Sequence, residues 1–236
     1  SKDSLTKIGQ QSGFLFISQG STTPDYSPLD EGKLFVVYNG IKVTFLGSNM
    51  PPLKKEVNKE GQNSIEEQLA AFVENNIDNC LDFSVFENQG LRITKKEKVV
   101  DASVNENNVV FSLEYPLTIE NPDGGKAEIK EFFLAHEVGL KNIYEFIGRY
   151  TENGPTDSDE FSVDVKKDDS GKSDIIIVSD EKSLLDVLPY KYFFAQNAGN
   201  DGLSPITGAV VSDGNNIPSA NAGLNRTVAL LVNSLL

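Results

Sequence analysis

The stretch Leu34-Phe-Val-Val-Tyr-Asn-Gly-Ile-Lys-Val-Thr-Phe-Leu46 carries the clearest structural signal in this chain of 236 residues. Two runs of β-branched and aromatic residues, which favour strands, flank the dipeptide Asn39-Gly40. Asn and Gly tolerate the positive φ angles that both central residues of a two-residue hairpin turn require. The stretch therefore predicts a β-hairpin, which the Pro51-Pro52 pair ends.

Three segments show the three- and four-residue spacing of apolar residues that is typical of amphipathic helices. The best begins at Ser64, which forms a capping box with Glu67, and its apolar stripe includes Cys80 and extends to Leu81. Residues 3–11 and 140–150 predict two more helices. A single cysteine cannot close an internal disulfide. We expect Cys80 to be buried, as free cysteines commonly are, with an intermolecular link or a reactive thiol as the alternatives.

Strands dominate between residues 91 and 138. Residues 91–104 and 109–119 are expected to pair across a short turn, and residues 126–138 to return as a further strand. Apolar residues alternate with mostly polar ones in the second of these segments, which indicates an antiparallel strand with one buried face. Pro116 cannot donate a ladder hydrogen bond, so it must lie at an edge, a bulge or a strand break.

The remaining segments complete an α+β pattern. Residues 13–18 predict a buried strand, residues 161–165 and 174–179 a second hairpin, residues 181–188 a short helix and residues 190–195 an aromatic strand. We therefore predict an α+β fold with antiparallel sheets, two or three amphipathic helices packed on one side, and an irregular C-terminal arm. Residues 1–196 would form one domain, with a candidate subdomain break near residues 51–63, and residues 197–236 would form the arm.

Composition and charge restrict the function. The chain has 21 Lys and Arg against 35 Asp and Glu, a net charge of −14. Nucleic acids and anionic lipids require clustered basic residues, so we expect neither as a partner. One His, one Cys and no Trp leave little for metal ligation or nucleophilic catalysis, and we expect no catalytic residue. A carboxylate-only enzyme such as a glycosidase is the alternative, because acids are plentiful.

One loop concentrates oxygen ligands of the kind that calcium prefers. Asp168, Asp169 and Asp174 are the candidate calcium ligands, and calcium is the only cofactor that the sequence suggests. The spacing does not match an EF-hand, so a solvated turn is the favoured interpretation, as it is for the acidic loop at residues 153–160. His136 has no second His or Cys with which to bind zinc, so a structural or surface role is favoured over that of a general base.

The composition changes at Asn197, after which the chain has no aromatic residue and no lysine. Asn225 begins a single glycosylation sequon, Asn225-Arg-Thr227. The apolar run that follows would either close its own domain or add to an exposed sheet edge of another subunit. Docking on its own domain is favoured, because a long loop costs little extra entropy. The candidate interaction residues are Thr227, Val228, Leu230, Leu231 and Val232.

Two adjoining segments, Ser64-Ile-Glu-Glu-Gln-Leu-Ala-Ala-Phe-Val-Glu-Asn-Asn-Ile-Asp-Asn-Cys-Leu81 and Phe83-Ser-Val-Phe-Glu-Asn-Gln-Gly90, resemble a segment of uncharacterised archaeal membrane-anchored surface proteins. Residues 8–17 and 115–119 fit the same pattern, so the resemblance spans roughly residues 5–195. Such proteins carry an N-terminal anchor and an ectodomain, sometimes with a second cysteine that could pair with the one matching Cys80. This chain has neither the anchor nor the second cysteine. The resemblance implies an extracellular location and no particular activity.

Together these observations predict a non-catalytic cell-surface structural or interaction protein. The more specific hypothesis is a filament or surface-layer subunit whose C-terminal arm docks on a neighbour. Its partners would be further copies of itself or another surface protein. Membrane attachment would require an anchor absent from this chain, because no stretch approaches the length of a membrane-spanning helix. An extracellular binding module for a small ligand, a glycan or calcium is the alternative.

Overall fold

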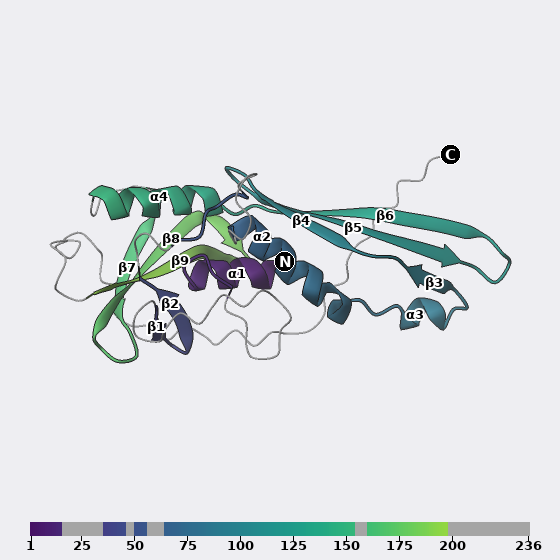
Figure 1. Cartoon of the computed structure of the whole chain (residues 1–236), viewed down its shortest axis with the longest axis horizontal. Coiled ribbons are helices and arrows are strands. Elements are labelled where there is room, and N and C mark those ends of the chain that lie inside the picture. Colours follow the sequence, from purple (N-terminus) through teal and green to yellow (C-terminus); the bar gives the residue numbers. More distant parts are fainter. Residues whose placement is uncertain (16–34, 46–49, 56–63, 154–159, 198–236) are drawn as a thin grey trace.

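A computed structural model describes residues 1–15, 35–45, 50–55, 64–153 and 160–197. These residues form helices and three antiparallel sheets, which confirms the predicted α+β class. Figure 1 shows two parts, which we call the body and the arm sheet. The arm sheet comprises the strands between residues 92 and 136 and is distinct from the C-terminal arm. It extends away from the body, which contains most of the helices. No helix in the described ranges is both long and apolar enough to cross a membrane.

The body is built on a three-stranded antiparallel sheet with β8 at its centre. Its strands are β7 (Ser162–Lys167), β8 (Ser173–Leu185) and β9 (Leu188–Asn197). Ser162 pairs with Ser179 and Lys167 with Asp174, which confirms the predicted second hairpin. The aromatic strand predicted at residues 190–195 is also confirmed, because it lies within β9.

Three helices share one hydrophobic core on one face of this sheet, as predicted. They are α1 (Lys2–Gln10), α2 (Ile65–Asn76) and α4 (Leu140–Asn153). Each contributes fully buried residues to a cluster that also holds alternate residues of β8 and β9. The capping box at the start of α2 is present, with the Glu67 amide donating to Ser64 Oγ at 3.1 Å and the Ser64 amide donating to the Glu67 carboxylate at 3.0 Å.

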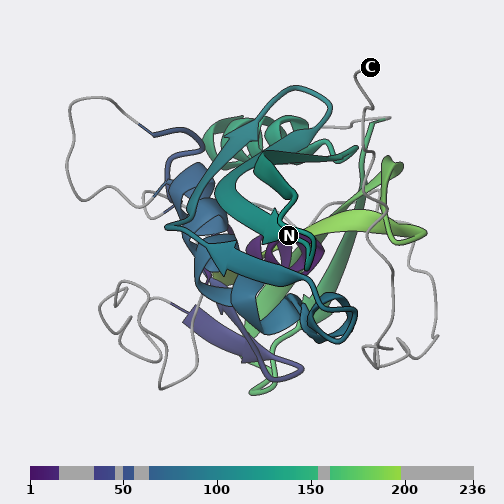
Figure 2. The ribbon, with the colours of Figure 1, turned by 90° about the vertical axis from the view of Figure 1, so that its right-hand side faces the viewer.

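The predicted first hairpin covers the opposite face of the body sheet. It consists of β1 (Phe35–Tyr38) and β2 (Ile41–Thr44), joined through Asn39 and Gly40 at φ angles of 49° and 75°. Its Val43 is fully buried against Ile175 and Ile177 of β8. Figure 2 shows α4 and this hairpin on opposite sides of the molecule, so the body sheet is a middle layer covered on both faces.

The arm sheet has four strands, β3 (Arg92–Lys95), β4 (Val99–Val104), β5 (Val109–Glu120) and β6 (Lys126–His136). β3 and β4 both pair with one edge of β5, and β6 pairs with the other edge. Buried and half-exposed residues alternate along most of β5, as predicted. The buried face packs against α2 and the segment after it, through Ile77 of a short 3-10 helix (Ile77–Cys80) and through Leu81 and Phe83, which precede α3 (Ser84–Glu87).

Pro116 explains a difference from the sequence prediction. Residues 91–104 form two strands and not one, because β3 and β4 stop on either side of this proline in β5. Pro116 has no amide hydrogen, so a continuous ladder cannot pass it. Its carbonyl instead accepts a hydrogen bond of 3.0 Å from the Lys96 amide, and the register with β6 shifts between Glu114 and Leu117. The prediction that Pro116 lies at a bulge or a strand break is confirmed.

The predicted burial of Cys80 is wrong. The α-helix ends at Asn76, and residues 77–80 continue as a 3-10 helix. Three residues per turn in place of 3.6 rotate the last side chains away from the stripe that an α-helix would have extended. Ile77 and Leu81 still pack on the arm sheet, whereas Cys80 is exposed.

Two further local predictions are wrong. Residues 181–188 are not helical but form the end of β8, a turn and the start of β9, with Leu185 paired to Leu188. Pairing with β9 overrides the local preference of this segment. The strand predicted at residues 13–18 does not form at residues 13–15, and residues 16–18 lie outside the described residues. Gly13 has a φ of 86° in the turn that follows α1, where its amide donates to the Ile8 carbonyl at 2.7 Å.

One core joins elements from α1 to β9. Residues 50–55, at the start of the candidate subdomain break, pack on it through Met50 and Leu53. Residues 56–63 and most of the predicted arm, residues 198–236, lie outside the described residues.

Candidate functional site

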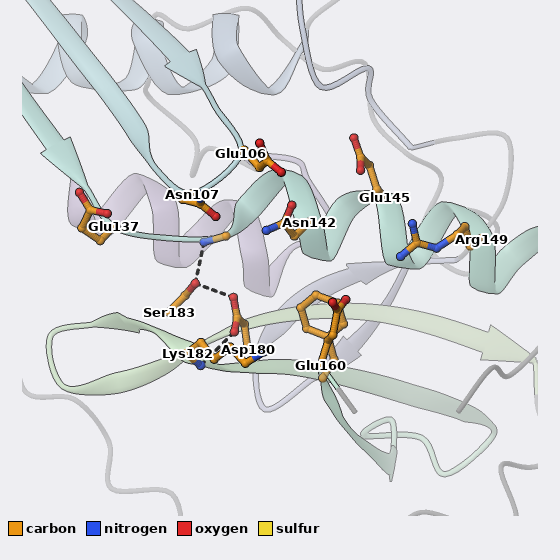
Figure 3. Close-up of a pocket in the computed structure, with 12 residues that line it drawn as sticks. Glu106, Asn107, Glu137, Asn142, Glu145, Arg149, Glu160, Asp180, Lys182 and Ser183 are labelled. Carbon is orange, nitrogen blue, oxygen red and sulfur yellow. Dashed lines mark hydrogen bonds between the residues drawn. The ribbon is translucent and has the colours of Figure 1, made fainter. Parts of the chain in front are cut away.

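A cleft of about 410 Å³ lies where the body meets the arm sheet. Figure 3 shows its lining side chains, which come from α4, from β8 and from the turns that precede β5, α4 and β7. The lining is mostly polar and predominantly acidic. It consists of Glu106, Asn107, Glu137, Gly139, Asn142, Glu145, Arg149, Glu160, Phe161, Asp180, Lys182 and Ser183.

The floor of the cleft is a hydrogen-bonded chain between β8 and the start of α4 (Figure 3). The Gly139 amide donates to Ser183 Oγ at 2.8 Å, and Ser183 Oγ donates to Asp180 Oδ2 at 2.5 Å. The other oxygen of Asp180 accepts from the Lys182 amide at 3.0 Å. Asp180 is only 5% exposed, so these donors compensate for much of the hydration that its carboxylate loses. These hydrogen bonds anchor the start of α4 to the irregular part of β8.

Gly139 is required by this close approach. A Cβ atom at this position would lie 2.6 Å from Asp180 Oδ2 and 3.0 Å from Ser183 Oγ. The Gly139 carbonyl accepts from the Ile143 amide, so Gly139 is the N-terminal cap of α4. The absence of a side chain therefore lets the helix start directly over the Asp180 carboxylate, where the positive end of the helix dipole favours a negative charge.

The cleft is lined mainly by polar and charged side chains. Among the described residues of the lining, Phe161 is the one aromatic residue, and acids outnumber the two basic residues, Arg149 and Lys182. Such a lining favours a cationic or hydroxyl-rich ligand over an apolar one. Asp180 and Ser183 serve in the anchor between β8 and α4. The only His in the chain, His136, is not part of the lining.

The candidate calcium ligand Asp168 makes structural hydrogen bonds. It is 7% exposed, and its carboxylate accepts from Ser170 Oγ at 2.5 Å and from the Ser173 amide at 2.8 Å. Burial alone would raise the pKa of Asp168, but these hydrogen bonds outweigh it and hold the pKa below its ordinary value. Asp168 therefore stabilises the turn between β7 and β8.

The other two candidate ligands also have protein partners. Asp169 accepts from the amides of Asn39 at 2.8 Å and Gly40 at 3.4 Å, which ties this turn to the first hairpin. Asp174 pairs with Lys167 at 2.6 Å. No group of three or more His, Cys, Asp or Glu residues suited to a metal occurs in the part of the chain that the structure describes. Calcium binding stays a prediction.

His136 lies at the end of β6, in contact with the N-terminal residue. Its Nε2 is 3.0 Å from Ser1 Oγ, and its ring packs edge-on against Phe111. Burial, together with the nearby positive charges of the α-amino group and Lys2, lowers the pKa of the imidazole. These contacts favour the structural role, since the ring joins β6 to the first residues of the chain.

A second candidate site is the outer edge of β6. This strand of 11 residues pairs with β5 on one side, and no other described strand pairs with it. Two large apolar side chains are exposed on it, Phe133 at 69% and Leu134 at 50%. They lie on opposite faces of the sheet, because Phe133 pairs with Ser112 and Leu134 with Phe111. Unpaired backbone groups beside exposed apolar side chains can template the addition of another strand.

Edge strands in natural proteins are commonly protected by charge, and β6 is protected along only part of its length. Its distal part carries Lys126, Glu128, Lys130 and Glu131, whereas residues 132–135 are Phe-Phe-Leu-Ala. Sequence reasoning predicted the strand but missed this site. The signal that could have found it is the abrupt end of charge after Glu131 in an otherwise exposed strand.

The other edge strands are charged or partly occupied. Val37 of β1 accepts a hydrogen bond from the Asp169 amide at 2.8 Å through its carbonyl. The Val104 amide at the end of β4 donates to Glu66 at 2.8 Å. The short β3 and the edge strand β7 both carry charged residues. The edge strand β9 is bridged to Phe45 at Ala195 and contacts α1. Among these described edge strands, β6 is the one with two large, exposed apolar side chains next to each other.

The predicted interaction residues Thr227, Val228, Leu230, Leu231 and Val232, and the sequon residue Asn225, lie outside the described residues. The same holds for Asp157 and Asp159 of the second acidic loop, whereas Glu160 lines the cleft. No protein-family model, curated protein or solved structure matches this chain.

Proposed function

We propose that this protein is a non-catalytic cell-surface structural or interaction protein that self-associates, as a subunit of a filament or surface layer, through its C-terminal arm. The observation that carries the proposal is the outer edge of β6, where Phe133 and Leu134 are exposed and with which no other described strand pairs. The extracellular location rests on the resemblance of residues 5–195 to archaeal surface proteins.

The shape of the molecule also supports an assembly role. Figure 1 shows the arm sheet projecting from the body. One face of this sheet packs on α2 and the segment after it, whereas the other face carries mainly exposed or half-exposed residues.

Negative-stain electron microscopy and light scattering of the full chain test this function. We expect filaments or regular oligomers, and we expect deletion of residues 227–236 to abolish them while the circular dichroism spectrum stays unchanged. A monomer at all concentrations, or assembly that survives the deletion, would contradict the proposal.

An extracellular binding module is the second candidate function, and the polar cleft between α4 and β8 favours it. Its acidic lining suits a cation or a hydroxyl-rich ligand such as a glycan. Calorimetric titration of the full chain with calcium tests the metal version. A flat isotherm would exclude calcium at the cleft and at the loop that contains Asp168.

A further inference from the structure

We propose that the outer edge of β6 at residues 132–135 is the receptor for residues 227–232 of a second copy of this chain, which adds to the arm sheet as a fifth strand. This inference rests on the proposed function and names the two surfaces that join.

The receptor is defined by what an added strand would cover. A strand beside β6 would satisfy the outward-pointing backbone groups of residues 132–135 and would bring its own side chains next to those of β6. Phe133 would gain a neighbour on the open face of the sheet, and Leu134 on the face that packs on α2. One strand would therefore cover both exposed side chains.

The donor segment fits both faces. Successive side chains of a strand point to opposite faces, so Val228, Leu230 and Val232 would lie on one face, and Ala229 and Leu231 on the other. Apolar side chains on both faces of the donor would lie beside Phe133 on the open face and beside Leu134 on the face that packs on α2. The β6 edge supplies one exposed apolar side chain on each face.

Charge favours the same pairing. Residues 198–236 contain two aspartates and one arginine, so nearly all of the net charge of −14 lies on residues 1–197. Two such bodies repel one another at close range. A nearly neutral segment can approach a neighbour without that cost, and residues 132–135 of the receptor carry no charge either.

The connecting chain is long enough to reach another molecule. Residues 198–226 separate β9 from the donor segment. At 3.3–3.6 Å for each extended residue, this connection can span up to about 100 Å. The donor segment is therefore free of any geometric requirement to return to its own body.

Charge substitution in the full chain tests the receptor. In the double variant Phe133→Lys with Leu134→Lys, two ammonium groups would have to be partly desolvated beside the apolar side chains of the added strand, so we expect association to weaken at least tenfold in sedimentation velocity. Val99→Lys is the matched control, because Val99 is an exposed apolar residue on β4 of the same sheet. We expect this control to associate as the unmodified chain does. Circular dichroism checks that all variants fold.

Leu230→Lys with Leu231→Lys tests the donor and separates the two proposals. If this variant and the receptor variant both lose association, the pairing is supported. If the donor variant loses association and the receptor variant retains it, the C-terminal arm still mediates assembly but β6 is not its receptor. That result would overturn the inference. If the unmodified chain does not associate at all, the proposed function fails.

Disulfide trapping distinguishes docking between copies from docking within one copy. On a Cys80→Ser background, a full chain with Leu134→Cys is mixed with a full chain with Leu230→Cys under mild oxidation. We expect a cross-linked heterodimer, and none when Val99→Cys replaces Leu134→Cys. If cross-linking occurs only in a single chain that carries both cysteines, the segment docks on its own body and the proposal for a second copy is wrong.

Discussion

The body sheet is covered on both faces, whereas the arm sheet is covered on one. In β8 the neighbours Ile175 and Ile176 are both buried, the first under the hairpin β1–β2 and the second under the helices. In β5 the neighbours Val110 and Phe111 differ, since Phe111 is buried and Val110 is half-exposed. The difference teaches that the body sheet is the central layer of the fold, whereas the arm sheet has one packed face and one face of exposed or half-exposed residues.

The largest expected effects test this contrast directly. Ile175→Ala and Ile176→Ala should each lower the free energy of unfolding by about 2–5 kcal/mol, because both leave cavities in packed layers. In β5, Phe111→Ala should cost about 3–5 kcal/mol and Val110→Ala about 1 kcal/mol or less. Urea unfolding of the four variants measures these values. Equal losses at both positions of β5 would show that the arm sheet is also covered on both faces.

The junction between the two regions should be sensitive to a single methyl group. Gly139→Ala places a Cβ within 2.6 Å of Asp180 Oδ2, so α4 must move away from β8. We expect a loss of about 1–3 kcal/mol in the free energy of unfolding, as is typical of overpacking. Gly148→Ala is the control, because a Cβ there meets no atom within 4 Å. It should be neutral or slightly stabilising, since Ala favours a helix more than Gly does.

A smaller effect tests whether the buried tyrosine hydroxyl groups of the body core have hydrogen-bond partners. Tyr190 donates its hydroxyl to the Leu5 carbonyl at 3.1 Å, whereas the buried hydroxyl of Tyr192 has no hydrogen-bond partner among the described residues. Tyr190→Phe should therefore cost about 1 kcal/mol, and Tyr192→Phe should be neutral or stabilising by a similar amount. Thermal unfolding of the matched pair measures the difference. A loss at Tyr192 as large as that at Tyr190 would reveal a partner for its hydroxyl.

The smallest effect concerns the loss of stability at low pH. It involves Asp168, in the turn between β7 and β8 that contacts the first hairpin. The pKa of Asp168 is lower in the folded chain than in the unfolded chain, so its contribution is present above the unfolded pKa and is lost as the pH falls through the folded pKa. Asp168→Asn should remove that part of the pH dependence below about pH 4. Unfolding measured from pH 2 to pH 7 checks this, and an unchanged acid slope would contradict it.

Much of the fold could be predicted because its signals are local. Asn39-Gly40 marked a hairpin, Ser64 with Glu67 marked a helix start, and alternation along residues 109–119 marked a half-buried strand. The incorrect predictions arose where contacts with distant residues determine the local structure. Residues 181–188 became strand through pairing with β9, and Cys80 became exposed when α2 tightened into a 3-10 helix.

The candidate sites were harder to predict than the fold. Asp180, Ser183 and Gly139 carry no motif, and they meet only because β8 and the start of α4 pack together. Phe133 and Leu134 have ordinary strand residues around them, and their exposure depends on β6 being an edge. The order of strands in a sheet is a property of long-range pairing, which periodicity along one strand does not encode.

The sequence by itself determined the α+β class, the positions of most helices and strands, and the acidic charge that argues against nucleic acid as a partner. Each of these depends on residue type and on spacing within a few turns or strand residues. Only the tertiary structure decided that β8 is buried on both faces, that β6 is left at an edge, and that a polar cleft forms over Asp180. Burial and edge position are set by which distant surfaces meet, because the hydrophobic effect acts on the surface removed from water and is not confined to neighbours in the chain.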